Sequence, residues 1–277
     1  MQESSSCGQQ VSLPFIVGIG ASAGGLEALQ QFFSAVPDNS GLAVVVIQHL
    51  SPDYKSLMAE ILGKYTSMMV LQAENGMEVE PNIVYLIPPK KNMTIKNGRL
   101  LLTDYVHGAI NHPIDTFLAS LAEERKAHAL CVILSGTGSD GTSGIKSIKE
   151  HDGLVLVQDT ESAKFDGMPR SAINTGLADF VLPPRELAEE ILNFSNYPAI
   201  VDISDNEELF SDKDTLSLIY LTMKRVSGID FTYYKKTTVL RRIERRMVVT
   251  HCPTLSSFAH LLEENQNEVD LLVKDIL

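Results

Sequence analysis

The chain has 277 residues, a length that suits one large domain or two smaller ones. Its 44% hydrophobic and 21% charged residues are ordinary for a globular protein, and a net charge of −12 argues against nucleic acid as the main partner. A run of about 18 apolar residues is absent, so we expect no membrane insertion, and the polar N-terminus lacks the apolar stretch of a secretory signal.

The three cysteines, Cys7, Cys131 and Cys252, are far apart and form no CxxC pair. This spacing argues against a disulfide framework and against a structural zinc site. We therefore expect a reduced, cytoplasmic protein that carries no metal.

Strands and helices are predicted to alternate from the N-terminus onward, after a disordered tail over residues 1–13. The apolar runs Phe15–Gly20 and Leu42–Gln48 are typical of buried parallel strands. Helices are predicted after each of them, the second over Ser56–Lys64. The apolar residues that recur at helical spacing in the first helix are Leu26, Leu29, Phe32, Phe33 and Val36.

Residues 82–102 change character and hold three short strands, and Asn97-Gly98 between the last two is a strong hairpin signal. We expect this hairpin to extend the main sheet in antiparallel fashion. The elements predicted beyond it are a helix over Ile114–Glu124, strands over Ala129–Leu134, Leu154–Val157 and Asp179–Leu182, and helices from Thr142 and over Arg185–Phe194. Residues 14–195 thus predict an α/β domain, a three-layer sandwich built on a mostly parallel sheet.

The pattern breaks over residues 196–212, which are polar and acidic and are predicted to form a linker. Residues 213–277 predict a small all-α module, and residues 221–277 carry 9 Lys/Arg against 7 Asp/Glu, unlike the acidic remainder. Its predicted helices cover Asp214–Val226, Thr238–Thr250, Thr254–Asn265 and a final segment that begins at Val269.

Three polar side chains follow three predicted strands, and ligands bind at the carboxyl ends of strands in an open α/β sheet. Ser22 lies in Gly20-Ala21-Ser22-Ala23-Gly24, which matches the G-x-S-x-G nucleophile elbow. His49 ends the second strand, and Asp140 lies in the loop SGTGSDGTSG. Together they predict a Ser-His-Asp triad at one sheet edge, in a chain order that differs from the common hydrolase order.

Each of these residues also has a simpler interpretation. Ser22 suits the N-cap of a helix, His49 suits a structural hydrogen-bonding role, and Asp140 suits an Asp-Gly turn or another N-cap. If the site is catalytic, backbone N–H groups at Ala23, Thr137 and Gly138 are the expected oxyanion donors, because a helix N-terminus and a glycine-rich loop expose such groups.

The motifs GIGASAGGLEAL, VIQHL, LSGTGSDG and AKFDGMPRSAI resemble the catalytic domain of the CheB-type protein-glutamate methylesterases, from about Phe15 to Phe194. The resemblance implies Ser22 as nucleophile, His49 and Asp140 as its partners, and no cofactor. Thr137 stands where that family usually has Met. Since the first predicted strand begins at Phe15, we expect no receiver domain ahead of it.

The segment DFTYYKKTTVLRRIERRM is similar to the helical N-terminal domain of CheR-type receptor methyltransferases. The resemblance implies a methylesterase–methyltransferase fusion, truncated here before the S-adenosylmethionine-binding domain into which the full-length fusion is expected to continue. The spacing of four arginines puts them on one helix face, either a solvated basic face or a docking surface for acidic receptor helices. They are Arg241, Arg242, Arg245 and Arg246.

The expected function is hydrolysis of glutamate methyl esters, and deamidation of glutamine, on the cytoplasmic helices of methyl-accepting chemoreceptors. One alternative is dinucleotide binding at Gly18-x-Gly20-x-x-x-Gly24, although Gln48-His49 stands where an acid should hold the ribose. A second alternative is a catalytically inactive signalling adaptor.

Overall fold

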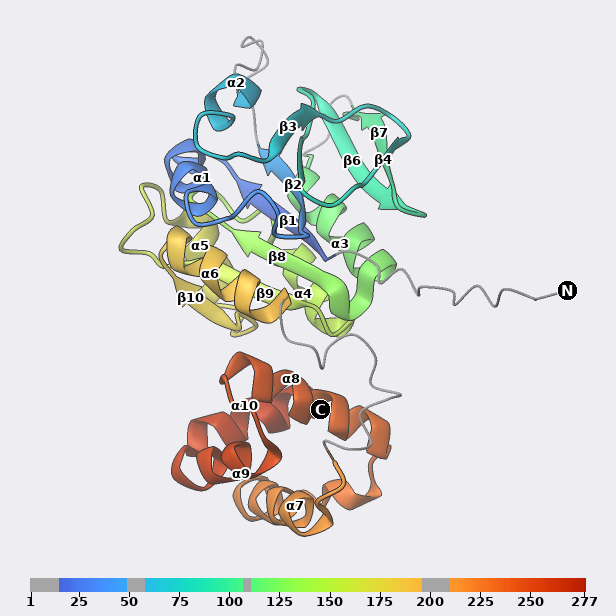
Figure 1. Ribbon diagram of the computed structural model, residues 1–277, viewed down its shortest axis with the longest axis vertical. Helices are drawn as coiled ribbons and strands as arrows, with labels where there is room; N and C mark the ends of the chain where they lie inside the picture. The colour runs from blue at the N-terminus through green and yellow to red at the C-terminus, as the bar shows by residue number, and fades with distance from the viewer. Residues whose placement is uncertain (1–14, 49–57, 107–110, 196–209) are drawn as a thin grey trace, which may run out of the picture. The chain divides into compact units, whose positions relative to one another are not determined.

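The structure is a computed structural model that describes residues 15–48, 58–106, 111–195 and 210–277. The chain divides into two compact units, residues 1–195 and 196–277, and each is described by itself (Figure 1). The predicted tail, and the predicted linker up to residue 209, lie outside the described residues. Within the described ranges, no helix combines the length and the apolar character that a bilayer crossing requires.

A parallel sheet of seven strands forms the centre of the first unit, in the order β10-β9-β8-β1-β2-β5-β3. Every neighbouring pair runs parallel, which confirms the predicted mostly parallel α/β fold. The strands are β1 Ile16–Ala21, β2 Ala43–Gln48, β3 Met69–Gln72, β5 Ile83–Leu86, β8 Ala129–Ile133, β9 Leu154–Gln158 and β10 Phe180–Leu182. Because β1 lies between β2 and β8, the segments that leave these three strands start from one edge of the sheet.

A separate antiparallel sheet consists of β4 (Met77–Glu78), β7 (Arg99–Asp104) and β6 (Lys91–Lys96). The predicted turn between β6 and β7 is present, since Asn97 and Gly98 have φ angles of 51° and 72°. Two consecutive positive φ angles are the mark of a type I′ hairpin turn, whose twist matches that of the flanking strands.

The expectation that this hairpin extends the main sheet was wrong, because β6 and β7 pair with β4 instead. The hairpin packs on a helix: the Ser120 hydroxyl accepts the Ile95 N–H at 3.0 Å, and the Glu124 carboxylate accepts the N–H groups of the turn. Residues 83–86, the first strand of the same stretch, join the main sheet in parallel between β2 and β3.

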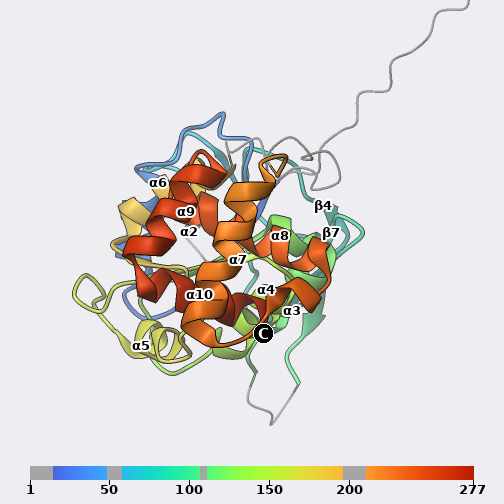
Figure 2. The same cartoon turned by 90° about the horizontal axis from the view of Figure 1, so that it is seen from below.

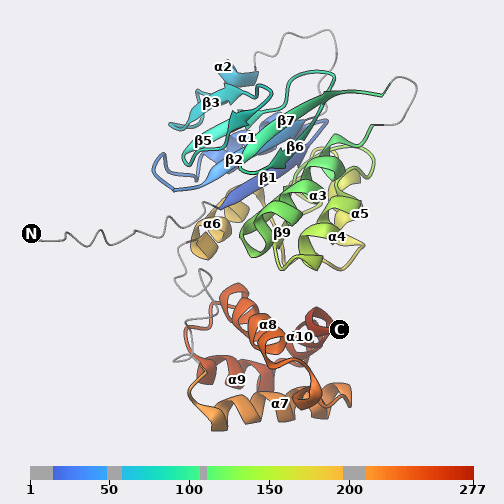
Figure 3. The same ribbon diagram turned by 90° about the vertical axis from the view of Figure 1, so that its right-hand side faces the viewer.

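Helices cover both faces of the main sheet (Figure 3). On one face lie α3 (Pro113–Arg125), α4 (Thr142–Glu150) and α5 (Gly167–Ile173). On the other, α1 (Gly25–Phe33) packs beside α6 (Pro184–Ser195). Among the described residues of this unit, the remaining helical segments are α2 (Met58–Leu62) and the 3₁₀ turn η1 (Lys126–His128).

Strand β1 has glycine at two positions that face α3. A Cβ atom at Gly18 would lie 2.9 Å from Leu118 Cδ2, and one at Gly20 would lie 2.6 Å from Ile114 Cγ2. Real side chains do not approach so closely, so only glycine permits this contact. The glycines thereby let the first turn of α3 lie directly against the end of β1.

The second unit is helical, as predicted, with a 3₁₀ turn η3 over Phe231–Tyr233. Its helices are α7 (Lys213–Ser227), α8 (Lys236–Val249), α9 (Leu255–Glu264) and α10 (Gln266–Ile276). Helix α7 packs against α9 and α10, and α10 also packs against α8 (Figure 2). Apolar side chains from all four helices form one core.

The predicted docking face of four arginines needs a correction. Arg246 forms a bidentate ion pair with Glu268 of α10, at 2.6 and 2.7 Å, and both side chains are 6% exposed. Arg245 is also buried, whereas Arg241 is exposed and Arg242 is half-buried. Desolvation lowers the pKa of Arg242, and the charge of Arg245 adds to this effect. Helical spacing alone does not reveal that α10 occupies part of this face.

Replacing Arg246 by Met leaves the Glu268 carboxylate buried without its guanidinium partner. We expect the free energy of unfolding of the helical unit to fall by about 3–5 kcal/mol, measured by urea denaturation of the whole chain. Arg241→Met, on the same helix but exposed, is the matched control and should change it by no more than about 0.5 kcal/mol. Equal stability of the two variants would contradict the structural role of the pair.

Candidate functional site

Ser22 lies in the turn that joins β1 to α1. Gly24 has a φ of 71° and is the N-cap of α1, and the Gly25 N–H donates to the Ser22 carbonyl at 2.9 Å. This left-handed glycine lets the chain reverse within three residues, as a nucleophile elbow requires. Ser22 is half-buried, and its hydroxyl makes no hydrogen bond to any residue that the structure describes.

The glycine-rich loop that follows β8 passes directly beside Ser22. The Ser22 N–H donates to the Ser135 carbonyl at 3.0 Å, and a Cβ atom at Gly136 would lie 2.9 Å from Ser22 Cβ. The same Cβ would lie 2.2 Å from the Met168 sulfur, so no other residue fits at position 136. Two loops that are distant in sequence are thus held together around the serine.

The Ser135 side chain joins three segments at this edge of the sheet. Its hydroxyl donates to the Ala23 carbonyl at 2.9 Å and accepts the Phe165 N–H at 3.0 Å. The Ser135 N–H donates to Gln158 Oε1 at 2.8 Å, and Ser135 and Gln158 are each 1% exposed. Buried polar groups with satisfied hydrogen bonds hold a loop in one conformation. Ser135 therefore fixes the serine turn relative to the glycine-rich loop and the segment after β9.

Three backbone N–H groups near Ser22 are available to an incoming ligand. Within the described ranges, the N–H groups of Ala23, Thr137 and Gly138 make no hydrogen bond, whereas the Gly136 N–H donates to the Phe165 carbonyl. Thr137 and Gly138 are exposed, and Gly138 has a φ of 86°. Such unsatisfied N–H groups beside a serine can bind the negative oxygen of a tetrahedral intermediate.

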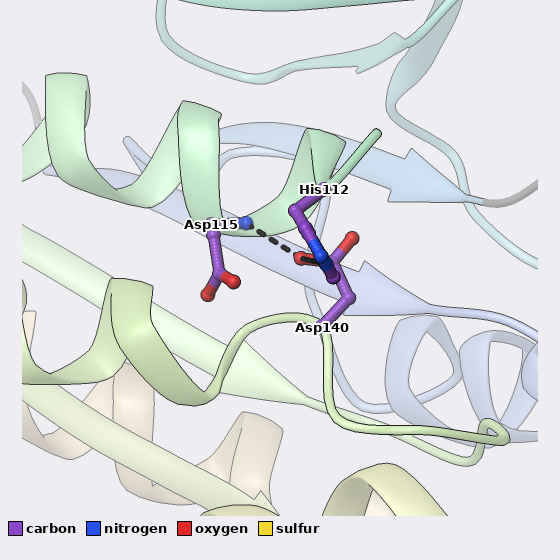
Figure 4. A group of neighbouring side chains, drawn as sticks. All are labelled: His112, Asp115 and Asp140. Carbon is purple, nitrogen blue, oxygen red and sulfur yellow. Dashed lines mark hydrogen bonds and ion pairs between the residues drawn. The ribbon is translucent and has the colours of Figure 1, made fainter. Parts of the chain in front are cut away.

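Asp140, the acid of the same loop, is only 5% exposed. Its Oδ2 accepts the Ile114 N–H at 3.1 Å. Its Oδ1 accepts the Asp115 N–H at 3.0 Å (Figure 4). His112 Nδ1 lies 3.8 Å from the same Oδ1. The carboxylate thus lies on the N-terminus of α3, where the N–H groups and the helix dipole favour its negative charge.

Asp115 lies beside Asp140 and is half-buried. Burial raises the pKa of Asp115, and the charge of Asp140 raises it further, although the N–H groups of Gly144 and Gly141 oppose these effects. Tyr105, just after β7, also has a raised pKa, because it is half-buried and because the negative charge of Asp140 lies near it.

Ligand atoms of His112, Asp115 and Asp140 lie within 4.8 Å of one another, a spacing that also occurs in metal sites. However, three of the four carboxylate oxygens already accept backbone N–H groups of α3 and α4. Helix capping therefore accounts for the position of both acids.

The structure places Ser22 and Asp140 after the adjacent parallel strands β1 and β8. His49 lies outside the described residues, so its predicted role stays a prediction. The residue before it, Gln48, is in register with Ala21 at the end of β1. The described residues thus bring together the serine turn and the loop with the acid.

Reasoning from the sequence missed Ser135, Gln158 and Asp115. Ser135 and Gln158 follow or end apolar strands, and nothing local distinguishes them from ordinary strand-end polar residues. Asp115 stands in the first turn of a predicted helix, where an acid is common without any further role. Only the fold shows that these side chains converge on the loops around Ser22.

Comparison with family models gives a match to the CheB methylesterase family over residues 17–191. A second match, to the all-alpha domain of CheR methyltransferases, covers residues 215–277. The crystal structure of the Thermotoga maritima CheB methylesterase catalytic domain is similar to 65% of this chain and 98% of that domain. Its TM-score is 0.59 and its sequence identity is 33%.

Two similar curated proteins carry the name protein-glutamate methylesterase/protein-glutamine glutaminase. The one from Thermotoga maritima is 35% identical over 182 residues, 64% of this chain and 53% of its own length. The one from Geobacter sulfurreducens is 36% identical over 182 residues, 63% of this chain and 50% of its own length. A 104.1 kDa protein of Rhodobacter capsulatus is 34% identical over 241 residues, 79% of this chain and 25% of its own length. The chain thus spans about half the length of the two named relatives.

Replacing Ser135 by Ala removes the hydroxyl that joins the serine turn to Phe165 and leaves partly buried backbone groups without this partner. We expect the free energy of unfolding of the first unit to fall by about 1–3 kcal/mol, measured by denaturant titration. Ser139→Ala, in the same loop but exposed, is the matched control and should leave it nearly unchanged. A Ser135→Ala variant as stable as this control would refute the assigned role.

Proposed function

The chain belongs to the CheB methylesterase family, and from this membership we propose that it hydrolyses the methyl esters of glutamate side chains in proteins. One observation carries the proposal: Ser22 stands in a strand–helix elbow, and a loop is held against it whose exposed N–H groups bond to no residue that the structure describes. Relatives at 35% and 36% identity are named for this activity and for glutamine deamidation. Since the chain spans about half of each, the activity, substrates and partners of the whole protein are part of the proposal.

In the proposed mechanism, His49 takes the proton of the Ser22 hydroxyl while the oxygen attacks the ester carbonyl. The tetrahedral intermediate collapses as the bond to the methoxy group breaks, and His49 returns the proton so that methanol leaves. Water then attacks the acyl-enzyme with the same assistance and releases the glutamate carboxylate and free Ser22. With a glutamine side chain the leaving group is ammonia, and the remaining steps are the same.

The negative oxygen of the intermediate is stabilised by N–H groups of Ala23, Thr137 and Gly138. These donors belong to the backbone, so Thr137 in place of the family's usual Met keeps the donor and changes only the shape beside it. Asp140 orients His49 and stabilises its charged form. Its own charge is favoured by the two N–H groups that it accepts from α3.

The substrates are the cytoplasmic helices of methyl-accepting chemoreceptors. The all-alpha domain of CheR methyltransferases follows the esterase unit in the same chain, so both units address the same class of modified side chain. The Rhodobacter capsulatus relative matches over 241 residues and is much longer than this chain. The full-length protein is a fusion that continues into an S-adenosylmethionine-binding methyltransferase domain.

The helical unit supplies the docking surface, at Arg241 and the half-buried Arg242 of α8. A basic surface of this kind attracts the acidic faces of receptor helices and speeds their association. Arg246 has no part in docking, because its guanidinium is engaged by Glu268 inside the unit.

Replacing Ser22 by Ala removes the attacking oxygen. We expect methanol release from a methylated receptor fragment to fall by about a thousandfold or more, measured by gas chromatography of the released methanol. Ser34→Ala, at the exposed end of α1, is the matched control and should keep the wild-type rate. Wild-type turnover by the Ser22→Ala variant would refute the mechanism. No turnover by the wild type would favour an adaptor, or a dinucleotide-binding domain if NAD binds instead.

Reversing the charge at Arg241, by Arg241→Glu, should weaken capture of the receptor without touching the chemistry. We expect KM for the receptor fragment to rise by about three- to tenfold while kcat stays the same. Arg225→Glu, at an exposed position of α7, is the control for a general change in net charge. An equal rise in KM for both variants would contradict a docking surface at Arg241.

A further inference from the structure

Helices α3 and α4 pack on each other, and in each the N-cap residue forms no capping hydrogen bond through its side chain. In α3 the N-cap is His112, whose side chain makes no capping hydrogen bond, and Pro113 has no N–H to donate. In α4 the N-cap is Gly141, which has no side chain. The first N–H groups of a helix need acceptors from outside it, so both helices depend on another segment.

Each helix obtains its cap from an acid of the other. Asp140, just before α4, accepts the N–H groups of Ile114 and Asp115 in the first turn of α3. In return, Asp115 Oδ1 accepts the N–H groups of Gly141 at 2.9 Å and Gly144 at 2.7 Å, at the start of α4. Figure 4 shows the two carboxylates side by side between the helices.

The backbone of α4 leaves no room for a cap of its own. Gly141 has a φ of 98°, and a Cβ atom there would lie 2.7 Å from Ile133 Cδ1. A Cβ atom at Gly144 would lie 2.6 Å from Leu118 Cβ. These glycines bring α4 so close to α3 that the Asp115 carboxylate reaches the N–H groups of α4.

We infer that Asp115 is a positioning residue of the esterase site. By holding Gly141 and Gly144, it fixes the loop end that carries Asp140, and so it sets the direction in which the Asp140 carboxylate points. This inference rests on the proposed function, in which Asp140 orients the catalytic histidine. A displacement of about 1 Å in such a group lowers turnover by up to about a hundredfold.

Other titratable groups of the described residues also face this pair. His112 is the N-cap of α3, Tyr105 follows β7, and Cys131 lies on β8. Burial raises the pKa of the Cys131 thiol, and the charge of Asp115 adds to the rise. Because Asp115 takes both N–H groups on a single oxygen, asparagine can keep these hydrogen bonds and remove the charge. The Asn variant therefore separates the hydrogen-bonding role from the charge.

The test compares Asp115→Ala and Asp115→Asn in the whole chain, by methanol release from a methylated receptor fragment. Asp115→Ala should lower kcat by about ten- to a hundredfold and leave KM within about twofold, whereas Asp115→Asn should recover most of kcat. Ser120→Ala removes from the same helix the hydroxyl that accepts the Ile95 N–H of β6, and as the matched control it should keep kcat. Wild-type kcat in Asp115→Ala, or an equal loss in Ser120→Ala, would overturn the inference.

Amide hydrogen exchange gives a second readout that needs no turnover. The Ile114 N–H, which donates to Asp140, should exchange faster in Asp115→Ala and stay protected in Asp115→Asn. If the wild type proves to have no esterase activity, the proposed function fails, yet this comparison still decides whether Asp115 holds Asp140. If Asp115→Ala does not fold, Asp115→Glu, which moves the carboxylate by one methylene, must lower kcat, and a wild-type value overturns the inference.

Discussion

The close packing of α3 on strand β1 is the constraint on which the rest of the first unit depends. Gly18 and Gly20 leave that face of the strand bare, and the side chains of Ile114 and Leu118 fill the space. The contact fixes both the height and the direction of α3. Its first turn consequently lies at the edge of the sheet where β1 and β8 end, and its N–H groups point at the loop that contains Asp140. A larger residue at either position would move α3 away from β1. The N–H groups of Ile114 and Asp115 would then no longer reach the Asp140 carboxylate.

Because of this arrangement, Asp140 also has a structural role, as the cap of α3. A buried carboxylate is costly unless it is hydrogen-bonded, and Asp140 accepts the backbone N–H groups of Ile114 and Asp115 at the start of α3. These N–H groups favour the negative charge of Asp140, and in the proposed mechanism this charge stabilises the protonated form of His49. Ser135 also has more than one structural role, because its hydroxyl donates to the Ala23 carbonyl and accepts the Phe165 N–H. The hydrogen bonds of Asp140 and Ser135 therefore stabilise the fold and also position the groups of the proposed site.

Features that depend on neighbouring residues could be predicted from the sequence. The elbow at Ser22 and the turn at Asn97-Gly98 follow from glycine positions within a few residues, and the buried strands follow from their apolar runs. Strand β3 was missed because Met69–Gln72 has only four residues, and so short an apolar run does not distinguish a strand from a helix. The cap given by Asp115 was missed because it joins residues 26 and 29 positions apart. Such contacts follow from packing, which local patterns do not encode.

The exposure of the arginines of α8 likewise could not be predicted from their spacing in the sequence. Helical spacing puts Arg241 and Arg245 on one face, and it says nothing about which neighbour covers that face. In the folded unit α10 presents Glu268 to Arg246, and the desolvation cost of the pair is offset by two short hydrogen bonds. Charge used inside a core cannot attract a partner, because its field is cancelled by the opposite charge beside it. Only exposed basic side chains such as Arg241 contribute to a docking surface. The number of arginines in the sequence therefore overestimates the charge that this surface presents.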